Sequence, residues 1–163
     1  MGQRGKQVKG LLAWFAITFA AAGIGAMASA GAENFYAQLV RPSWAPPGSV
    51  FGPVWSVLYT LMALAVWTVW RIRGTATAPR TLALFVVQLV VNAVWSWLFF
   101  GLRSGAAAFA DAVLLFLLVA ATTIAFWRVR PLAGVMMMPY VAWVGFACAL
   151  TWSTWRLNPQ LLG

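Results

Sequence analysis

The hydrophobic and polar positions divide the chain into five long apolar runs separated by short polar segments. The runs cover roughly residues 11–31, 53–70, 81–101, 106–127 and 132–155. Each run is long enough to cross a hydrocarbon core of about 30 Å at about 1.5 Å per residue of helix. Because lipid cannot hydrogen-bond to open backbone groups, all five runs should be α-helices. The pattern predicts an all-α integral membrane protein, a five-transmembrane-helix bundle forming one domain over residues 1–163.

Composition and charge agree with a membrane protein. Hydrophobic residues make up 63 % of the chain, charged residues 8 %, and the mean hydropathy is +0.85. Soluble domains carry about 25 % charged residues. The net charge of +9 suggests nucleic-acid binding at first. However, the basic residues flank the apolar runs, as expected next to lipid headgroups. We therefore expect a lipid bilayer as partner and no nucleic acid.

The basic residues are distributed unequally between the two sides of the predicted bundle. An odd number of spans places the two termini on opposite sides. Three basic residues lie on the side opposite the N-terminus, namely Arg41, Arg103 and Arg156. Eight lie on the N-terminal side: Arg4, Lys6, Lys9, Arg71, Arg73, Arg80, Arg128 and Arg130. Because cytoplasmic segments are enriched in Lys and Arg, we expect a bacterial inner (cytoplasmic) membrane, with a cytoplasmic N-terminus and residues 32–52 facing outward.

Small residues are concentrated in the first span. Ala22, Ala26 and Ala30 recur at every fourth position, and such spacing lets helix backbones approach closely. Internal packing and a homodimer interface both explain this pattern, and we favour the homodimer.

The residues available for catalysis are few. The chain has no histidine, and its acids are Glu33 and Asp111. This inventory excludes a His-dependent triad, a paired-carboxylate glycosidase site and a His/Cys metal site. A P-loop and a dinucleotide fingerprint are also missing from the sequence. We expect no metal and no required cofactor. For Asp111, near the start of the fourth span, we expect a structural role, either pairing with Arg103 or capping the helix.

Aromatic and amide side chains are the remaining chemistry. The chain holds 11 Trp, 11 Phe and 3 Tyr. In the third span, one helix face carries polar and aromatic residues at i, i+4, i+7 and i+11: Gln88, Asn92, Trp95 and Phe99. Amides are costly toward lipid, so this face should point inward. It fits either interhelical hydrogen bonding or the wall of a ligand pocket.

Two further spans carry aromatic residues at fourth-position spacing. Trp55 and Tyr59 follow Pro53 in the second span, and Trp143 lies between Pro139 and Ala147 in the fifth. Together with the third span they present three aromatic faces, beneath a polar, proline-rich segment at residues 32–52 that we call the capping loop. Such faces would enclose a planar hydrophobic ligand, or pack as a core.

Three segments resemble the translocator protein family, also called tryptophan-rich sensory proteins (TspO/MBR). They are residues 35–47, which read FYAQLVRPSWAPP, with 51–55 and 58–59; residues 88–95 with 99–101; and residues 139–143 with 156–158. Together they extend over nearly the whole chain in the family's order. The chain departs from the family at Thr151, where Asn is common, and at Trp152, where the sterol motif of animal members has Tyr. Cholesterol binding is therefore not expected.

The resemblance implies a five-helix bundle, usually a homodimer, whose first loop covers a ligand cavity. Family members bind porphyrins such as protoporphyrin IX and haem, and isoquinoline carboxamide or benzodiazepine-type drugs. Tetrapyrroles would then be this protein's ligands, in a receptor or transporter linked to tetrapyrrole handling and stress or light signalling. Carried onto this chain, the ligand-binding residues are Trp44, Pro46, Trp55, Tyr59, Gln88, Asn92, Trp95, Phe99, Trp143 and Ala147.

Some bacterial family members degrade protoporphyrin under light, with tryptophans implicated. Trp44 and Trp143 match those tryptophans and would be the catalytic residues of such an enzyme. Receptor or transporter and light-dependent enzyme are thus alternative hypotheses. A purely structural partner protein is the third, and it leaves the amides and the Trp-Pro-Pro loop without a role.

Overall fold

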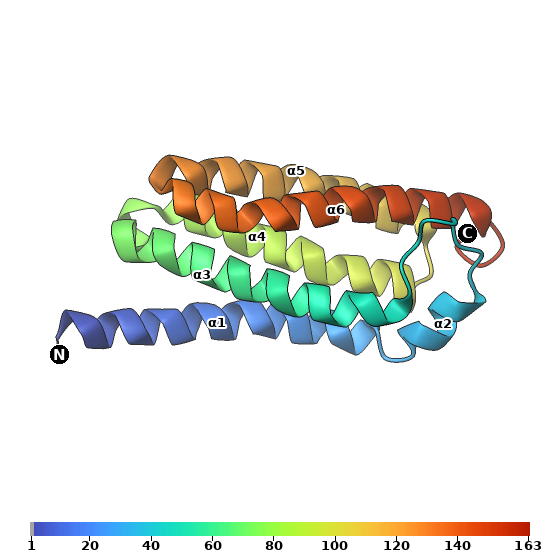
Figure 1. Ribbon diagram of the computed structural model, residues 1–163, viewed down its shortest axis with the longest axis horizontal. Helices are drawn as coiled ribbons and strands as arrows, with labels where there is room; N and C mark the ends of the chain where they lie inside the picture. Colours follow the sequence, from blue (N-terminus) through green and yellow to red (C-terminus); the bar gives the residue numbers. More distant parts are fainter. Residues whose placement is uncertain (1) are drawn as a thin grey trace.

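The computed structural model describes residues 2–163 as a bundle of five long helices (Figure 1). These helices are α1 (Gln3–Ala28), α3 (Phe51–Thr77), α4 (Pro79–Ser96), α5 (Gly105–Val129) and α6 (Pro131–Leu157). A wide π-helical turn, η2 (Trp97–Gly101), extends α4. All five are long and apolar enough to cross a membrane. The predicted five-span, all-α fold is confirmed.

The observed helices extend beyond several predicted boundaries. Helix α1 begins at Gln3 and ends at Ala28, whereas the prediction was 11–31. Helix α3 runs from Phe51 to Thr77 instead of 53–70, interrupted at Gly74, whose φ of 69° leaves the helical region. Hydropathy detects the part of a helix that lies in hydrocarbon, and charged turns such as Arg4–Lys9 and Arg71–Arg73 continue the same helices past it.

The capping loop is partly helical. It contains α2 (Ala32–Gln38) and a short 3-10 turn, η1 (Gly48–Val50), which leads directly into α3. Gly31, at φ 84°, adopts the left-handed conformation that glycine permits and turns the chain from α1 into α2. Residues 39–47 between α2 and η1 form the irregular part of the loop.

Proline marks the start of two spanning helices. Pro79 and Pro131 occupy the first positions of α4 and α6, where a missing N–H costs no hydrogen bond. The connections α3–α4 and α5–α6 are consequently tight, and each pair of helices runs antiparallel. Both connections lie at the end of the bundle that holds the N-terminus, while α2 and the C-terminus lie at the opposite end (Figure 1). We call the corresponding halves the N-side and C-side halves.

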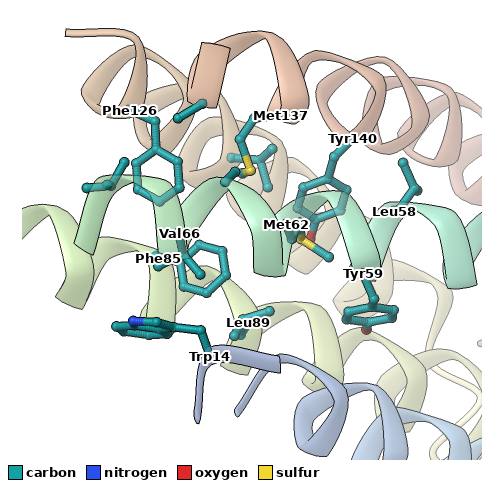
Figure 2. Packing of buried hydrophobic residues seen from close by; sticks show 14 of the residues in the cluster. Trp14, Leu58, Tyr59, Met62, Val66, Phe85, Leu89, Phe126, Met137 and Tyr140 are labelled. Atoms are coloured by element: carbon teal, nitrogen blue, oxygen red, sulfur yellow. The ribbon is translucent and has the colours of Figure 1, made fainter. Parts of the chain in front are cut away.

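The N-side half is filled by large apolar side chains. Met62, Phe85, Phe126 and Met137, from four different helices, are fully buried. Figure 2 shows these side chains converging between the helices, with Trp14 of α1 closing the cluster from below. The Phe85 ring stacks on Phe126 at a centroid distance of 5.7 Å and meets Trp14 edge-on at 6.0 Å. This half therefore forms a continuous packed core.

Candidate ligand cavity

The C-side half of the bundle contains a partly open cavity of about 830 Å³. Its lining comes from the C-terminal halves of α1, α4 and α6, the η2 turn and the N-terminal halves of α3 and α5, with residues of α2 and η1 from the capping loop. Pockets for drug-sized ligands usually measure about 300–1,000 Å³. The cavity is therefore large enough to hold a small organic ligand.

Small residues of α1 leave the space that the cavity occupies. The side of α1 that lines it consists mainly of Ala22, Gly23, Gly25, Ala26 and Ser29. A Cβ built on Gly23 would meet no atom within 4 Å. Two of the three alanines singled out in the sequence thus lie on the cavity wall, and Ala30 lies in the turn after α1. Whether the chain dimerises through this helix stays a prediction.

Three helices contribute aromatic walls. Trp55 and Tyr59 of α3 lie with ring centroids 5.5 Å apart, and Trp95 stacks on Phe99 of η2 at 5.0 Å and 10°. From α6, Trp143 meets Phe51 edge-on at 5.8 Å. Trp55, Tyr59, Trp95, Phe99 and Trp143, all proposed from the sequence, line the cavity, and so does Ala147. These ring faces suit a flat apolar ligand.

A chain of hydrogen bonds forms the polar floor of the cavity. The Tyr59 hydroxyl donates to Asn92 Oδ1 at 2.9 Å, Asn92 Nδ2 donates to the Tyr140 hydroxyl, and that hydroxyl donates to Gln88 Oε1 at 3.0 Å. A carboxamide has two N–H donors and two oxygen lone pairs. The Asn92 amide, which is 5 % exposed and lines the cavity, therefore keeps one donor and one lone pair for a ligand.

Gln88 lies one turn deeper than Asn92 and does not line the cavity. It is fully buried, accepts from Tyr140 and approaches the Met62 sulfur at 4.0 Å. The two interpretations of the third-span face thus divide between its amides. Gln88 makes interhelical contacts alone, whereas Asn92 makes interhelical hydrogen bonds and also lines the cavity.

Trp44 and Pro46 also lie outside the cavity lining. Trp44 is 48 % exposed, and its ring packs edge-on against Phe146 at a centroid distance of 5.6 Å. Pro46 contributes its carbonyl oxygen, which accepts a hydrogen bond from the Tyr36 hydroxyl at 3.2 Å. The parts of the capping loop that line the cavity are α2 and residues 48–52.

The charges near the cavity belong to the capping loop. Glu33 is the charged residue of the lining, and no Lys or Arg is among the described lining residues. The Arg41 guanidinium lies over the Tyr36 ring, 4.9 Å from its centroid. Burial raises the pKa of the Tyr36 phenol, which the hydrogen bond and charge of Arg41 partly offset. The phenol is therefore neutral at physiological pH.

The predicted pairing of Asp111 with Arg103 is wrong. The Arg103 guanidinium instead lies over the Phe35 ring of α2, 4.7 Å from its centroid. Asp111 Oδ2 is buried and has no hydrogen-bond partner within residues 2–163. Nor does Asp111 cap α5, whose N-cap residue is Ser104. In the described part of the chain, no group of three or more His, Cys, Asp and Glu residues gathers at one place to hold a metal ion.

Sequence reasoning missed several residues of the cavity. Tyr140, which is fully buried beneath the cavity, connects Asn92 of the lining to the deeper Gln88, and a phenol at mid-span was a signal of a buried hydrogen bond. Thr151 and Thr154 extend the α6 wall at i+8 and i+11 from Trp143, so the helical period extended past Ala147 would have found them. Glu33 and Tyr36 lie in α2, which carried no helix signal strong enough to orient their side chains.

A second, shallower hollow of about 630 Å³ lies between α3 and α6 on the outside of the bundle. Apolar side chains line it, among them Val57 and Ala142, which are exposed. Trp143 contributes to the lining of this hollow as well as to that of the cavity.

Fold and site together define a class, a multi-pass α-helical membrane protein with a ligand-sized internal cavity. Within that class, the profile of the TspO/MBR family matches residues 13–156, and the chain belongs to this family. The sequence resemblance is thereby confirmed.

Named relatives agree with the family assignment. Protein CrtK of Rhodobacter capsulatus is 44 % identical over 154 residues, which cover 91 % of this chain and 93 % of the relative. The translocator protein of Homo sapiens is 41 % identical over 127 residues, covering 77 % and 75 %. The tryptophan-rich sensory protein of Cereibacter sphaeroides is 39 % identical over 146 residues, covering 87 % and 90 %. These similarities support the role of a membrane receptor or sensor.

Proposed function

We propose that this protein is a membrane receptor or transporter that binds porphyrins, such as protoporphyrin IX and haem, in the C-side cavity. Isoquinoline carboxamide and benzodiazepine-type ligands would occupy the same space. The proposal is supported by the aromatic walls of the cavity together with the Asn92 amide, which has one donor and one lone pair left for a ligand. Flat rings stack on the indoles, and Asn92 donates to, or accepts from, a polar group of the ligand. The role would lie in tetrapyrrole handling and stress or light signalling.

Quenching of tryptophan fluorescence by protoporphyrin IX tests the proposal. The parent protein in detergent should show saturable quenching. Loss of one hydrogen bond in Asn92→Ala should weaken binding by about fivefold, at roughly 1 kcal/mol for the bond. Trp143→Phe should reduce both affinity and quenching, because it removes an indole of the wall.

Trp152→Phe is the matched control, since Trp152 lies on the same helix but is 44 % exposed and outside the lining. Its quenching curve should keep the parent's midpoint. Unchanged curves in both Asn92→Ala and Trp143→Phe would remove the site from this cavity.

The second candidate function is light- and oxygen-dependent degradation of bound protoporphyrin IX. A specific contact favours it: Phe146 packs against both proposed catalytic tryptophans, at centroid distances of 5.4 Å to Trp143 and 5.6 Å to Trp44. Trp143 lines the cavity and Trp44 lies at the surface, so a radical formed beside the ligand would have a second indole nearby.

Illumination of the complex in air, with an anaerobic sample beside it, separates the two functions. A new absorbing product that forms only with oxygen, and is lost in Trp143→Phe, supports the enzyme. Binding without any product leaves a receptor or transporter.

We further propose that the protein resides in a bacterial inner membrane with its N-terminus in the cytoplasm, and that it forms a homodimer. The eight basic residues at the N-terminal end of the bundle support the orientation. The small residues of α1 favour a dimer. Light scattering of the detergent-solubilised protein tests the dimer, and a monomeric mass would contradict it.

A further inference from the structure

Asn158, the residue after α6, joins that helix to the capping loop. Val40 N–H donates to Asn158 Oδ1 at 2.8 Å, and Asn158 Nδ2 donates back to the Val40 carbonyl at 2.8 Å. The same Nδ2 donates to the Thr154 carbonyl at 2.7 Å. The side chain is 5 % exposed. One amide thus pairs with a backbone 118 residues away in the way that a neighbouring strand would.

These two bonds attach a part of the capping loop that has few other polar connections. Within the described chain, they are the only hydrogen bonds between residues 33–47 and residues 51–163. The Tyr36–Pro46 bond lies inside the loop itself. Phe35 and Leu39 also pack against Phe99 and Leu162, and ring contacts join Tyr36 to Phe51 and Trp44 to Phe146. The Arg103 guanidinium lies over the Phe35 ring. Among the described residues, hydrogen bonds therefore hold residues 33–47 to the helical bundle at one point, beside α2.

The other side of this attachment is firmly placed. Beyond Asn158 the chain turns back, and the Leu162 carbonyl accepts a hydrogen bond from Gly105 N–H at 2.7 Å, while the Leu162 side chain is fully buried. On the preceding turn, Thr154 both lines the cavity and bonds to Asn158. The attachment point is thus continuous with the cavity wall of α6.

We propose that Asn158 is a positioning residue that holds the capping loop closed, so that a ligand enters or leaves the cavity only when its two bonds to Val40 break. This inference rests on the proposed function of the cavity as a binding site. Loosening the attachment raises the association and dissociation rates together, because both require the open loop. The dissociation constant changes much less than either rate.

Asn158→Leu tests the proposal, because leucine fills a similar volume without donating or accepting. Hydrogen–deuterium exchange of the full-length protein in nanodiscs, without any ligand, should show faster exchange for peptides that cover residues 35–45. Stopped-flow quenching with protoporphyrin IX should then show both rates raised on the order of tenfold, at roughly a factor of three to five for each hydrogen bond. The dissociation constant should change less than about threefold.

Gln160→Leu is the matched control, an exposed amide two residues further along. It should leave exchange and both rates at parent values. Exchange in the core around residues 62–69 verifies that the variant is folded, and if Asn158→Leu fails this check, the smaller Asn158→Ser replaces it.

Unchanged exchange at residues 35–45 overturns the proposal, and so does faster exchange with unchanged protoporphyrin rates. A parent protein without saturable quenching contradicts the proposed function. In that case the exchange measurement alone decides whether Asn158 holds the loop closed.

Discussion

Gln88 and Asn92 show how strongly the surroundings of a residue determine its role. Both are carboxamides on one face of α4, a single turn apart, and both bond to the Tyr140 hydroxyl. Gln88 lies in the packed N-side half, where its side chain links helices. Asn92 lies where the packing opens, so part of its hydrogen-bonding capacity faces the cavity. A step of one helical turn separates a structural residue from a candidate ligand contact.

The position of Glu33 leads to a prediction about the effect of ligand charge on binding. Glu33 is exposed and is a lining residue of the cavity, with no basic residue among the described lining positions. Glu33→Gln should therefore tighten binding of protoporphyrin IX, which has two propionates, by about two- to fivefold, since like charges about 4 Å apart in water repel by about 1 kcal/mol. Fluorescence titration at low and high salt measures the change, which salt should reduce.

A neutral isoquinoline carboxamide is the control ligand for Glu33→Gln. Its affinity should stay constant. An equal gain for both ligands would mean that the substitution alters the loop and not the charge.

Helix α1 combines two environments along its length. At Gly10 the absence of a side chain admits the Trp70 indole, since a Cβ would lie 2.1 Å from that ring. At Gly23, beside the cavity, a Cβ would meet nothing within 4 Å. The same residue type thus allows tight packing at one end of the helix and bounds an empty space at the other.

The two glycines give a matched pair of substitutions. Gly10→Ala should destabilise the fold by about 1–3 kcal/mol, because the indole must shift in a packed core. Gly23→Ala should be neutral or stabilising by up to about 1 kcal/mol, because alanine favours the helix. Thermal unfolding in the same detergent compares them, and equal stabilities would contradict the packing at Gly10.

The whole molecule is asymmetric along the bundle axis. The N-side half is packed and ends in turns rich in basic residues, whereas the C-side half is hollow and covered by the capping loop. With the proposed cytoplasmic N-terminus, the half that holds the cavity would face away from the cytoplasm.

This asymmetry predicts the topology. Alkaline phosphatase fused after Gly163 should be active, because that enzyme folds outside the cytoplasm, and a fluorescent protein fused before the N-terminus should fluoresce. Inactive phosphatase with a fluorescent C-terminal fusion would place the cavity on the cytoplasmic side.

Much of the site could be predicted from helical spacing, because in a regular helix the spacing of residues determines which face each side chain lies on. Trp55, Tyr59, Asn92, Trp95, Phe99, Trp143 and Ala147 line the cavity for this reason. Trp44 and Pro46 lie in irregular chain, where no period orients a side chain. Gln88 lies on the inward face of α4, as predicted, but one turn away from the cavity. A sequence pattern does not reveal at which level of a bundle the packing leaves a cavity.

The sequence by itself determined the five spans, their helical state and the inward direction of the amide and aromatic faces, because lipid leaves backbone and side-chain polar groups no other partner. Only the tertiary structure decided where the cavity lies, which amide lines it and how Asn158 joins the end of α6 to the capping loop. Such contacts depend on side chains from helices far apart in sequence meeting at one depth. Large side chains fill the N-side half of the bundle. In the C-side half, the small side chains of α1 leave space for the cavity.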